Sequence, residues 1–188
     1  MATGRAVRRS TAPAGMAPLH PRKKWRAITL ATLLLIPGYW FMLNGLVSAA
    51  ATGSSGPNAA PLIAFGLALI PFVFMVLAFL SEHPRAPGAV LRAMGLALLV
   101  GIPISALAAD AVTGLVAGVG AGGIAALRSD LGHDWKSRAL AVLAVSAFVF
   151  VLLRIAFAPA LLLAPALPFT AIGVADHLSE RRREVADR

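Results

Sequence analysis

Residues 93–127 read AMGLALLVGIPISALAADAVTGLVAGVGAGGIAAL, a stretch of 35 residues in which Asp110 is the only charged side chain. As one straight helix it would reach about 50 Å, well beyond the roughly 30 Å hydrocarbon core of a bilayer. A single crossing would also separate the basic residues that follow it, Arg128, Lys136 and Arg138, from those that precede it. Both difficulties are removed if the stretch is a helical hairpin of two short spans that turns near Asp110.

The same pattern recurs in residues 139–175, which carry only Arg154 as a charge and lie between two basic segments. A second hairpin, turning near Ala158 and Pro159, keeps both segments on one side of the membrane. Across the chain, 16 of the 17 Lys and Arg residues fall in four clusters between apolar stretches. Basic residues near the ends of spans are retained on the cytoplasmic side, so an even number of crossings separates successive clusters.

We therefore expect an all-α, polytopic integral membrane protein with six transmembrane helices in three hairpins and both termini in the cytoplasm. The expected spans are residues 27–50, 61–80, 93–109, 111–127, 139–158 and 160–175. Residues 1–24 lack apolar periodicity and are expected to form a disordered basic cytoplasmic tail. The transmembrane domain then covers residues 25–175, and residues 176–188 form a short cytoplasmic C-terminal helix.

The composition excludes an ordinary soluble domain. Hydrophobic residues make up 59% of the chain and charged residues 13%, with a mean hydropathy of +0.81, whereas soluble domains are about 25% charged. A cleaved signal peptide ending near residues 49–51 is a weaker alternative for the first span, because the apolar stretch exceeds the usual length of about 7–15 residues. The preference for Arg over Lys, 14 to 3, is typical of a GC-rich bacterial genome, so we expect the bacterial inner membrane.

The net charge of +9 is concentrated at the start of the chain, where residues 1–26 alone carry +7. A basic cluster beside the first span is expected to orient that span and to contact anionic lipids, at about 1 kcal/mol per basic residue near the surface. The lipid-contacting residues of this cluster are Arg22, Lys23, Lys24 and Arg26. Nucleic acid is not expected as a partner, because the other segments nearly balance their charges.

A stripe of glycines, Gly114, Gly118 and Gly122, occupies one face of the fourth expected span. Glycine at every fourth position lets two helix backbones approach closely in a membrane. The stripe is expected to pack either against another helix of the same chain or against a second copy in a homo-oligomer, and the sequence leaves both open.

Prolines recur within the expected spans and predict helix kinks. They are Pro37, Pro71, Pro103, Pro165 and Pro168. Each lacks a backbone donor and frees a carbonyl, and broken helices line the substrate sites of many transporters. Proline is also simply commoner in membrane helices than in soluble ones, so the kinks alone do not establish transport.

Two charged residues inside the apolar stretches are candidates for an intramembrane ion pair. Arg154 lies sixteen residues beyond Arg138, about 24 Å along a helix, which places it near the far interface. Asp110 lies at the turn of the other hairpin on the same side, so the two could tie the hairpins together. The alternatives are that Arg154 extends to the head groups while Asp110 caps the fourth helix, or that Asp110 carries protons or cations.

No catalytic site, metal site or cofactor site is expected. The chain has no cysteine, and its four histidines lack the spacing of a metal motif. No glycine-rich phosphate loop followed by lysine is present, and no pair of carboxylates lies within a span. We therefore expect no enzyme activity and no cofactor.

Two function classes remain. The favoured one is a non-catalytic membrane subunit or scaffold of a bacterial envelope complex, because no intramembrane charged site is evident. The alternative is a small permease or channel-like transporter, for which the prolines, the glycine stripe and the two far-side charges argue. A membrane-protein partner is expected in the first class, and no residue pattern identifies either the partner or a substrate.

Overall fold

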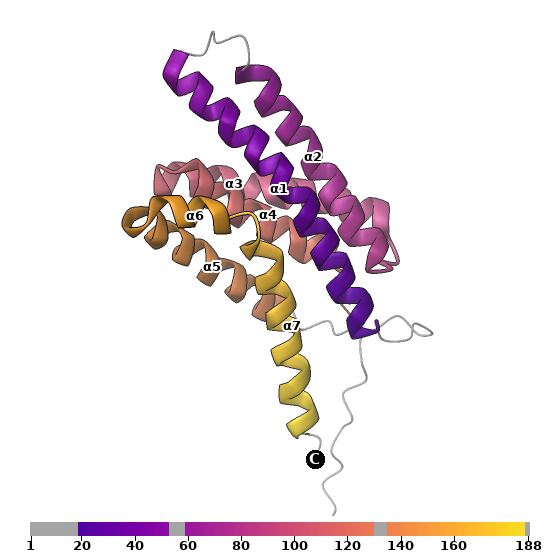
Figure 1. Cartoon of the computed structure of the whole chain (residues 1–188). Helices are drawn as coiled ribbons and strands as arrows, with labels where there is room; N and C mark the ends of the chain where they lie inside the picture. Colours follow the sequence, from indigo (N-terminus) through magenta and orange to yellow (C-terminus); the bar gives the residue numbers. More distant parts are fainter. Residues whose placement is uncertain (1–18, 53–58, 130–134, 187–188) are drawn as a thin grey trace, which may run out of the picture.

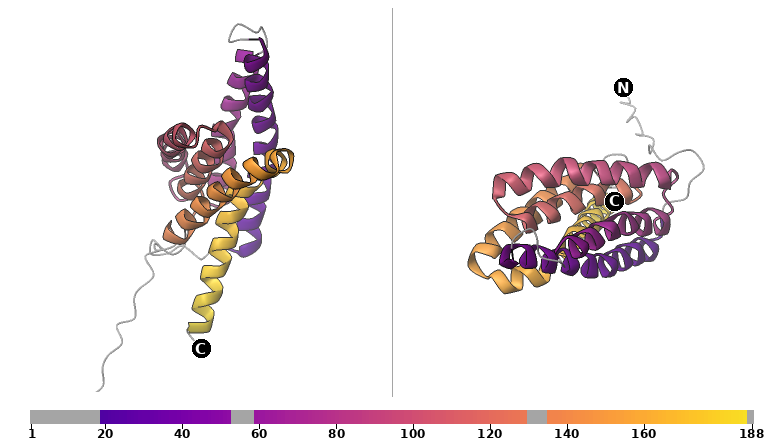
Figure 2. Two further views of the ribbon diagram at one scale, coloured as in Figure 1. Left: turned by 90° about the vertical axis from the view of Figure 1, so that its left-hand side faces the viewer. Right: turned by 90° about the horizontal axis from the view of Figure 1, so that it is seen from above.

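The computed structural model describes residues 19–52, 59–129 and 135–186, and every regular element within these ranges is an α-helix. The helices are α1 (Pro21–Thr52), α2 (Ala59–Leu80), α3 (Ala86–Ala108), α4 (Ala111–Ala126), α5 (Trp135–Ile155), α6 (Phe157–Leu163) and α7 (Leu167–Ala186). Figure 1 shows α1 and α2 as a long hairpin, with α3, α4 and α5 lying obliquely across it. Seen from above, α7 lies nearly end-on among the other helices (Figure 2).

Four of these helices, α1, α2, α3 and α5, are long and apolar enough to cross a membrane. The bent pair α6 and α7 would make a fifth span, while α4 has 16 residues and is shorter than the core of a bilayer requires. The apolar helices fit a multi-pass membrane protein. The six-span arrangement and the side of each terminus stay predictions.

The hairpin predicted for residues 93–127 is formed by α3 and α4, and it turns near Asp110 as the sequence predicts. Helix α3 ends at Ala108, Ala109 adopts the left-handed conformation with φ 49°, and Asp110 precedes the first residue of α4. The Asp110 amide donates to the carbonyl of Ser105 over 3.1 Å, which satisfies one of the last carbonyls of α3. This turn lets α3 and α4 pack side by side in antiparallel orientation.

The sixth expected span, residues 160–175, is not one helix. It is divided between α6 and α7, whose axes differ by 64°. Pro165 and Pro168 cannot donate the backbone hydrogen bonds that would continue α6, and Pro168 instead lies in the first turn of α7, where no donor is needed. The other three prolines, Pro37, Pro71 and Pro103, lie inside helices that continue through them.

The ends of the chain differ from expectation at two points. Helix α1 begins at Pro21, so residues 21–24 belong to a helix and not to a disordered tail, while residues 1–18 lie outside the described residues. Helix α7 runs on to Ala186 as the predicted C-terminal helix, but Asp176 in it is buried and not solvated.

Helix α4 lies at the centre of the bundle, and small side chains make this possible. Ten of its 16 residues are buried, and five of those ten are glycines. Gly120 faces Val142 of α5, while Gly123 faces Phe169 and Ile172 of α7. Four neighbouring helices approach α4 closely, which leaves little room for side chains on α4 itself. The bulky side chains at these contacts therefore come from the neighbouring helices.

The glycine stripe of α4 finds its partner within the chain, on α3. Each glycine lies against one carbonyl oxygen of α3, and the contacts repeat once per turn. A methyl group added to the glycine would lie 2.7 Å from the Gly101 oxygen at Gly114, 2.5 Å from the Ala97 oxygen at Gly118, and 2.7 Å from the Ala93 oxygen at Gly122. Real Cβ atoms do not approach that closely, so only glycine fits this register.

Gly118→Ala is expected to force α3 and α4 apart and to lower the free energy of unfolding by about 1–3 kcal/mol, the usual cost of overpacking. The matched control is Gly95→Ala on α3, where an added methyl group meets no atom within 4 Å. Thermal melts in detergent should show a lower Tm for Gly118→Ala and an unchanged or raised Tm for Gly95→Ala. Equal Tm values for the two variants would contradict the close approach.

Candidate functional site

The most unusual feature of the structure is a buried arginine at the start of α5. Arg138 is 1% exposed, and its guanidinium forms a two-point interaction with the carboxylate of Asp176 on α7. The Nε and Nη2 atoms donate to Asp176 Oδ1 and Oδ2, each over 2.7 Å. This planar, charge-assisted arrangement is the strongest that a side-chain pair can make.

The same guanidinium also completes the C-terminal end of α4. Arg138 Nη1 donates to the carbonyl of Leu127 over 3.0 Å, and Nη2 donates to the carbonyl of Arg128 over 3.0 Å. Carbonyls at a helix C-terminus lack partners within the helix and carry partial negative charge. A buried cation therefore supplies both the hydrogen bonds and the charge that this helix end needs.

Lys24 on α1 joins the pair from the other side. Its Nζ lies 3.2 Å from Asp176 Oδ2 and 2.7 Å from Glu180 Oε1, and its side chain is almost fully buried. We call Lys24, Arg138, Asp176 and Glu180 the ion cluster. Two cations and two anions balance, so the ion cluster connects α1, α5 and α7 without leaving a net buried charge.

A second set of contacts, partly exposed and partly buried, borders the ion cluster at the loop after α2. Lys23 Nζ lies 2.5 Å from Glu82 Oε1, and this ammonium holds the pKa of the Glu82 carboxyl below its usual range. The amide of Arg128 donates to Ser81 Oγ over 3.1 Å, and Arg128 Nη1 lies 3.9 Å from Glu82 Oε2. These contacts attach the loop between α2 and α3 to the end of α4.

The structure therefore assigns different roles to part of the predicted lipid-contacting cluster. Lys24 is buried in the ion cluster and Lys23 is paired with Glu82, whereas Arg22 and Arg26 are exposed. The sequence interpretation missed the ion cluster because it treated each charged segment as a solvated loop.

A signal was nevertheless present in the hairpin predicted for residues 139–175. A turn near Ala158 places Arg138 and Asp176 at nearly equal distances from the turn, and so at the same depth. Opposite charges at matched depth on adjacent helices indicate a pair, and the structure brings these two together.

At the opposite end of α4, Asp110 acts as the N-terminal cap. Its Oδ1 accepts from the amide of Val112 over 3.1 Å, and its Oδ2 accepts from the amide of Thr113 over 2.9 Å and from the Thr113 hydroxyl. A carboxylate at this position satisfies orphan donors and complements the positive end of the helix dipole. The capping alternative therefore describes Asp110.

Arg154 does not form an ion pair with Asp110 among the contacts of the described residues. Its Nη2 instead donates to the carbonyl of Ala108 over 3.4 Å, and its guanidinium lies over the Phe150 ring, 4.8 Å from the centroid. Ala108 lies two residues before Asp110, so Arg154 still links α5 to the turn between α3 and α4. The link runs through a backbone carbonyl and not through the carboxylate.

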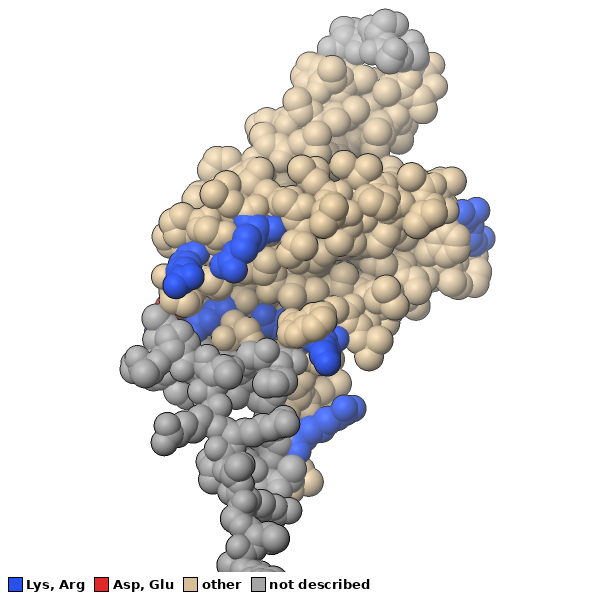
Figure 3. Space-filling view, turned by 180° about the vertical axis from the view of Figure 1, so that it is seen from behind, with Lys and Arg blue, Asp and Glu red and all other residues tan. Residues whose placement is uncertain are grey.

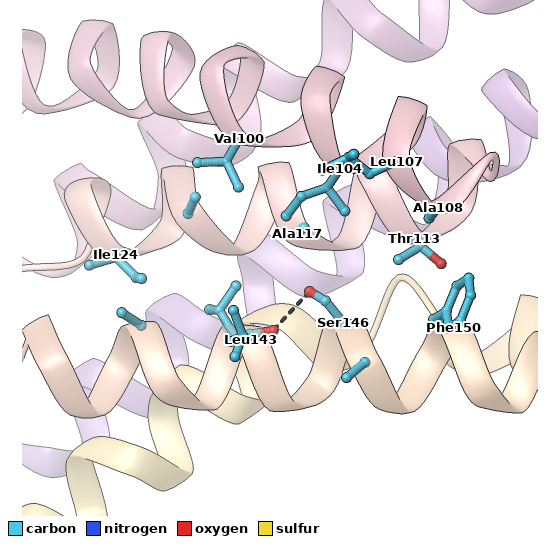
Figure 4. Close-up of a pocket in the computed structure, with 14 residues that line it drawn as sticks. Val100, Ile104, Leu107, Ala108, Thr113, Ala117, Ile124, Leu143, Ser146 and Phe150 are labelled. Atoms are coloured by element: carbon cyan, nitrogen blue, oxygen red, sulfur yellow. Dashed lines mark hydrogen bonds between the residues drawn. The ribbon is translucent and has the colours of Figure 1, made fainter.

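A groove of about 450 Å³ lies between α3 and α5, with α4 as its floor. Figure 4 shows Val100 and Ile104 of α3 on one side and Leu143 and Phe150 of α5 on the other. Its two hydroxyl groups are turned to local acceptors: Ser146 donates to its own helix at the carbonyl of Val142 over 2.8 Å, and Thr113 bonds Asp110. The groove is therefore apolar in chemistry.

Within residues 19–52, 59–129 and 135–186, no three His, Asp or Glu side chains lie close enough to hold a metal ion. Figure 3 shows that the basic residues visible from behind lie in the middle and lower parts of that face and at its right edge, while the upper part shows no Lys, Arg, Asp or Glu. The chain matches no protein-family model, no curated protein and no solved structure.

Arg138→Leu is expected to lower the free energy of unfolding by about 3–5 kcal/mol, because it leaves a buried carboxylate with an incomplete partner set. Asp176→Leu should be similarly harmful, since it leaves a buried guanidinium. Lys23→Gln, which breaks an exposed pair at the same end, is the matched control and should have little effect. Unfolding in mixed detergent with SDS measures the three free energies.

The double variant Arg138→Leu with Asp176→Leu should be less destabilised than the sum of the single variants, because the strongest uncompensated charge is gone. Additive losses would show that the two side chains do not interact as the structure describes.

Asp110→Ala should cost about 1 kcal/mol of stability through loss of the helix cap, whereas Asp110→Asn keeps an acceptor oxygen and should cost less. Thermal melts in detergent measure both. A proton-carrying role predicts a different pattern, in which Asp110→Asn abolishes a transport phenotype while stability stays intact. That pattern would contradict a purely structural role for the carboxylate.

Proposed function

We propose that this chain is a non-catalytic, multi-pass membrane subunit or scaffold of a bacterial envelope complex. The observation that carries this proposal is the role of the buried charges: Arg138, Asp176 and Lys24 link α1, α5 and α7 to one another and to the end of α4. Among the described residues, the only buried side-chain polar atoms without a hydrogen-bond partner are the hydroxyl oxygens of Thr32 and Tyr39. What the described residues offer to a partner is apolar surface.

The polar residues that could have lined a transport path support this view. Asn44 donates to the carbonyl of Trp40 over 2.8 Å, Ser146 to that of Val142, and Thr170 to that of Ala166 over 2.7 Å. Each bond lies within one helix, four residues apart. These local bonds use the single hydroxyl donors of Ser146 and Thr170, whereas the exposed Asn44 amide keeps a second N–H and its carbonyl oxygen.

The outward face of α3 is the best candidate for a partner surface. In the most apolar 18-residue stretch of α3, only 6% of the stretch is buried in the structure. The corresponding share is 28% in α1 and in α2, and 22% in α5. The large exposed side chains that share this face of α3 are Leu91, Leu98, Leu99 and Ile102. The glycine contacts with α4 hold α3 firmly from behind, so this face is a rigid apolar ridge suited to packing against a helix of another membrane protein.

The permease alternative rests on the groove between α3 and α5. Its volume of about 450 Å³ could hold a small apolar solute, and Thr113 and Ser146 line it. Transport of a polar solute would require both hydroxyls to leave their present acceptors. The groove therefore favours an apolar occupant, and the subunit role remains the stronger proposal.

A photo-crosslinking benzoylphenylalanine placed at Leu99 on α3 is expected to capture one discrete protein partner in cell membranes. The matched position is Leu33 on α1, which is also exposed and apolar, at 57% against 71% for Leu99. Immunoblots should show a defined adduct at Leu99 and none at Leu33. If neither position gives a protein adduct, or both give the same one, the α3 face is not a specific partner surface.

A further inference from the structure

A second groove, of about 520 Å³, runs between α5 and α7 and differs from the groove between α3 and α5. Small residues form much of its wall: Ala141 and Ala144 from α5, and Ala171 and Ala175 from α7. Because these side chains are short, the groove remains open along both helices. On α7 it extends from Leu167 to Arg182, which is about 22 Å of helix.

One end of this groove is polar and basic. Ser137, Ser179 and Arg182 line it there. The Ser179 hydroxyl donates to the carbonyl of Ala175 over 2.7 Å and lies 3.3 Å from Ser137 Oγ, so Arg182 is the group at this end that can meet an anion. Arg182 is exposed and has no hydrogen bond or ion pair with another described residue. None of the described residues that line the groove between α3 and α5 is charged, so the combination of an apolar groove and an unpaired cation is particular to the α5–α7 groove.

The neighbouring acids do not neutralise Arg182. Asp176 and Glu180 on α7 are both bound within the ion cluster by Arg138 and Lys24. Arg182 lies two residues beyond Glu180, which is about 200° around the helix axis and so faces away from the ion cluster. No acidic residue is among the described residues that line the groove.

The start of α5 adds two further features suited to a membrane interface. Trp135 is 58% exposed, and Lys136 Nζ lies 5.9 Å from the centroid of its ring. Lys136 precedes Leu140, a lining residue, by one helical turn and so shares its face of α5. Tryptophan is enriched at the level of lipid head groups, which places the basic end of the groove at that level.

We propose that the α5–α7 groove binds one anionic phospholipid, with an acyl chain between the two helices and the phosphate at Arg182. The length of the groove exceeds half of the roughly 30 Å hydrocarbon core, so a chain starting at Arg182 stays within it through one leaflet. The free guanidinium favours an anionic head group over a zwitterionic one. This site is separate from the basic cluster at the start of α1 and does not depend on the proposed subunit role.

Native mass spectrometry of the full chain in detergent tests the proposal, with phosphatidylglycerol and phosphatidylcholine of identical acyl chains as probes. The unmodified protein is expected to bind phosphatidylglycerol about five-fold more tightly than phosphatidylcholine, the effect of one basic residue near an anionic head group. Equal affinity for the two lipids would overturn the proposal.

Arg182→Gln should weaken phosphatidylglycerol binding about five-fold and remove the preference over phosphatidylcholine. Arg181→Gln is the matched control, because it makes the same charge change at the adjacent residue, which does not line the groove. Arg182→Lys keeps the charge and should retain most of the preference. If Arg181→Gln weakens binding as much as Arg182→Gln, attraction is spread over the surface and the site does not exist.

Ala144→Phe should fill the groove and weaken binding of both lipids without changing the charge. Ala144 is exposed within the groove, so the larger ring should not disturb the core. Ala147→Phe is the control, since Ala147 is equally exposed but lines the groove between α3 and α5. Unchanged lipid affinity in Ala144→Phe would exclude the acyl chain from the α5–α7 groove and overturn the proposal.

Discussion

The close packing of α4 is the constraint on which the rest of the structure depends. A helix contacted by four others must carry small side chains, and its glycines let the backbone of α3 approach within van der Waals contact. Burial of a whole helix in an apolar bundle also leaves its terminal backbone groups away from water, which is costly unless they are bonded. Asp110 meets this need at the N-terminus and Arg138 at the C-terminus. The two charges have the signs that the helix dipole requires.

The ion cluster follows from that requirement. A guanidinium placed against the end of a buried helix needs an anion, and Asp176 supplies it from α7; the remaining acceptor capacity of Asp176 then engages Lys24 of α1. Because the charges lose their water on burial, such a cluster adds little to net stability. An arrangement of helices that leaves one of these charges without its partner is, however, strongly destabilised. We infer that the ion cluster selects the register of α1, α5 and α7 around α4. Uniform apolar faces would leave that register weakly determined, because lipid tails are as apolar as the side chains.

The parts predicted from the sequence are those set by local rules. The turn at Asp110 follows from span length, and the close approach of α4 follows from glycine at every fourth residue. The sequence analysis predicted helix kinks at Pro165 and Pro168, but not that residues 164–166 would form a turn that divides the sixth span into two helices. A proline in a turn and a proline inside a helix look alike without knowledge of the helix boundary. The ion cluster was missed because it joins residues 24, 138 and 176, which are far apart in the chain. Charge near a span end indicates the side of the membrane, but tertiary packing decides whether that charge meets lipid or another helix.

This distinction bears directly on what the protein can do. A charge that is paired inside the bundle stabilises the fold and is unavailable to a ligand, so the count of basic residues overstates the surface offered to lipids. Lys24 and Arg138 belong to the first kind, and Arg182 belongs to the second because the acids beside it are already engaged. The two surfaces that we propose for recognition, the apolar ridge of α3 and the α5–α7 groove, both lie on the outside of the bundle. When the buried charges of a membrane protein stabilise its own fold, the surface left for lipids and other proteins consists of apolar side chains and the few charges that remain unpaired.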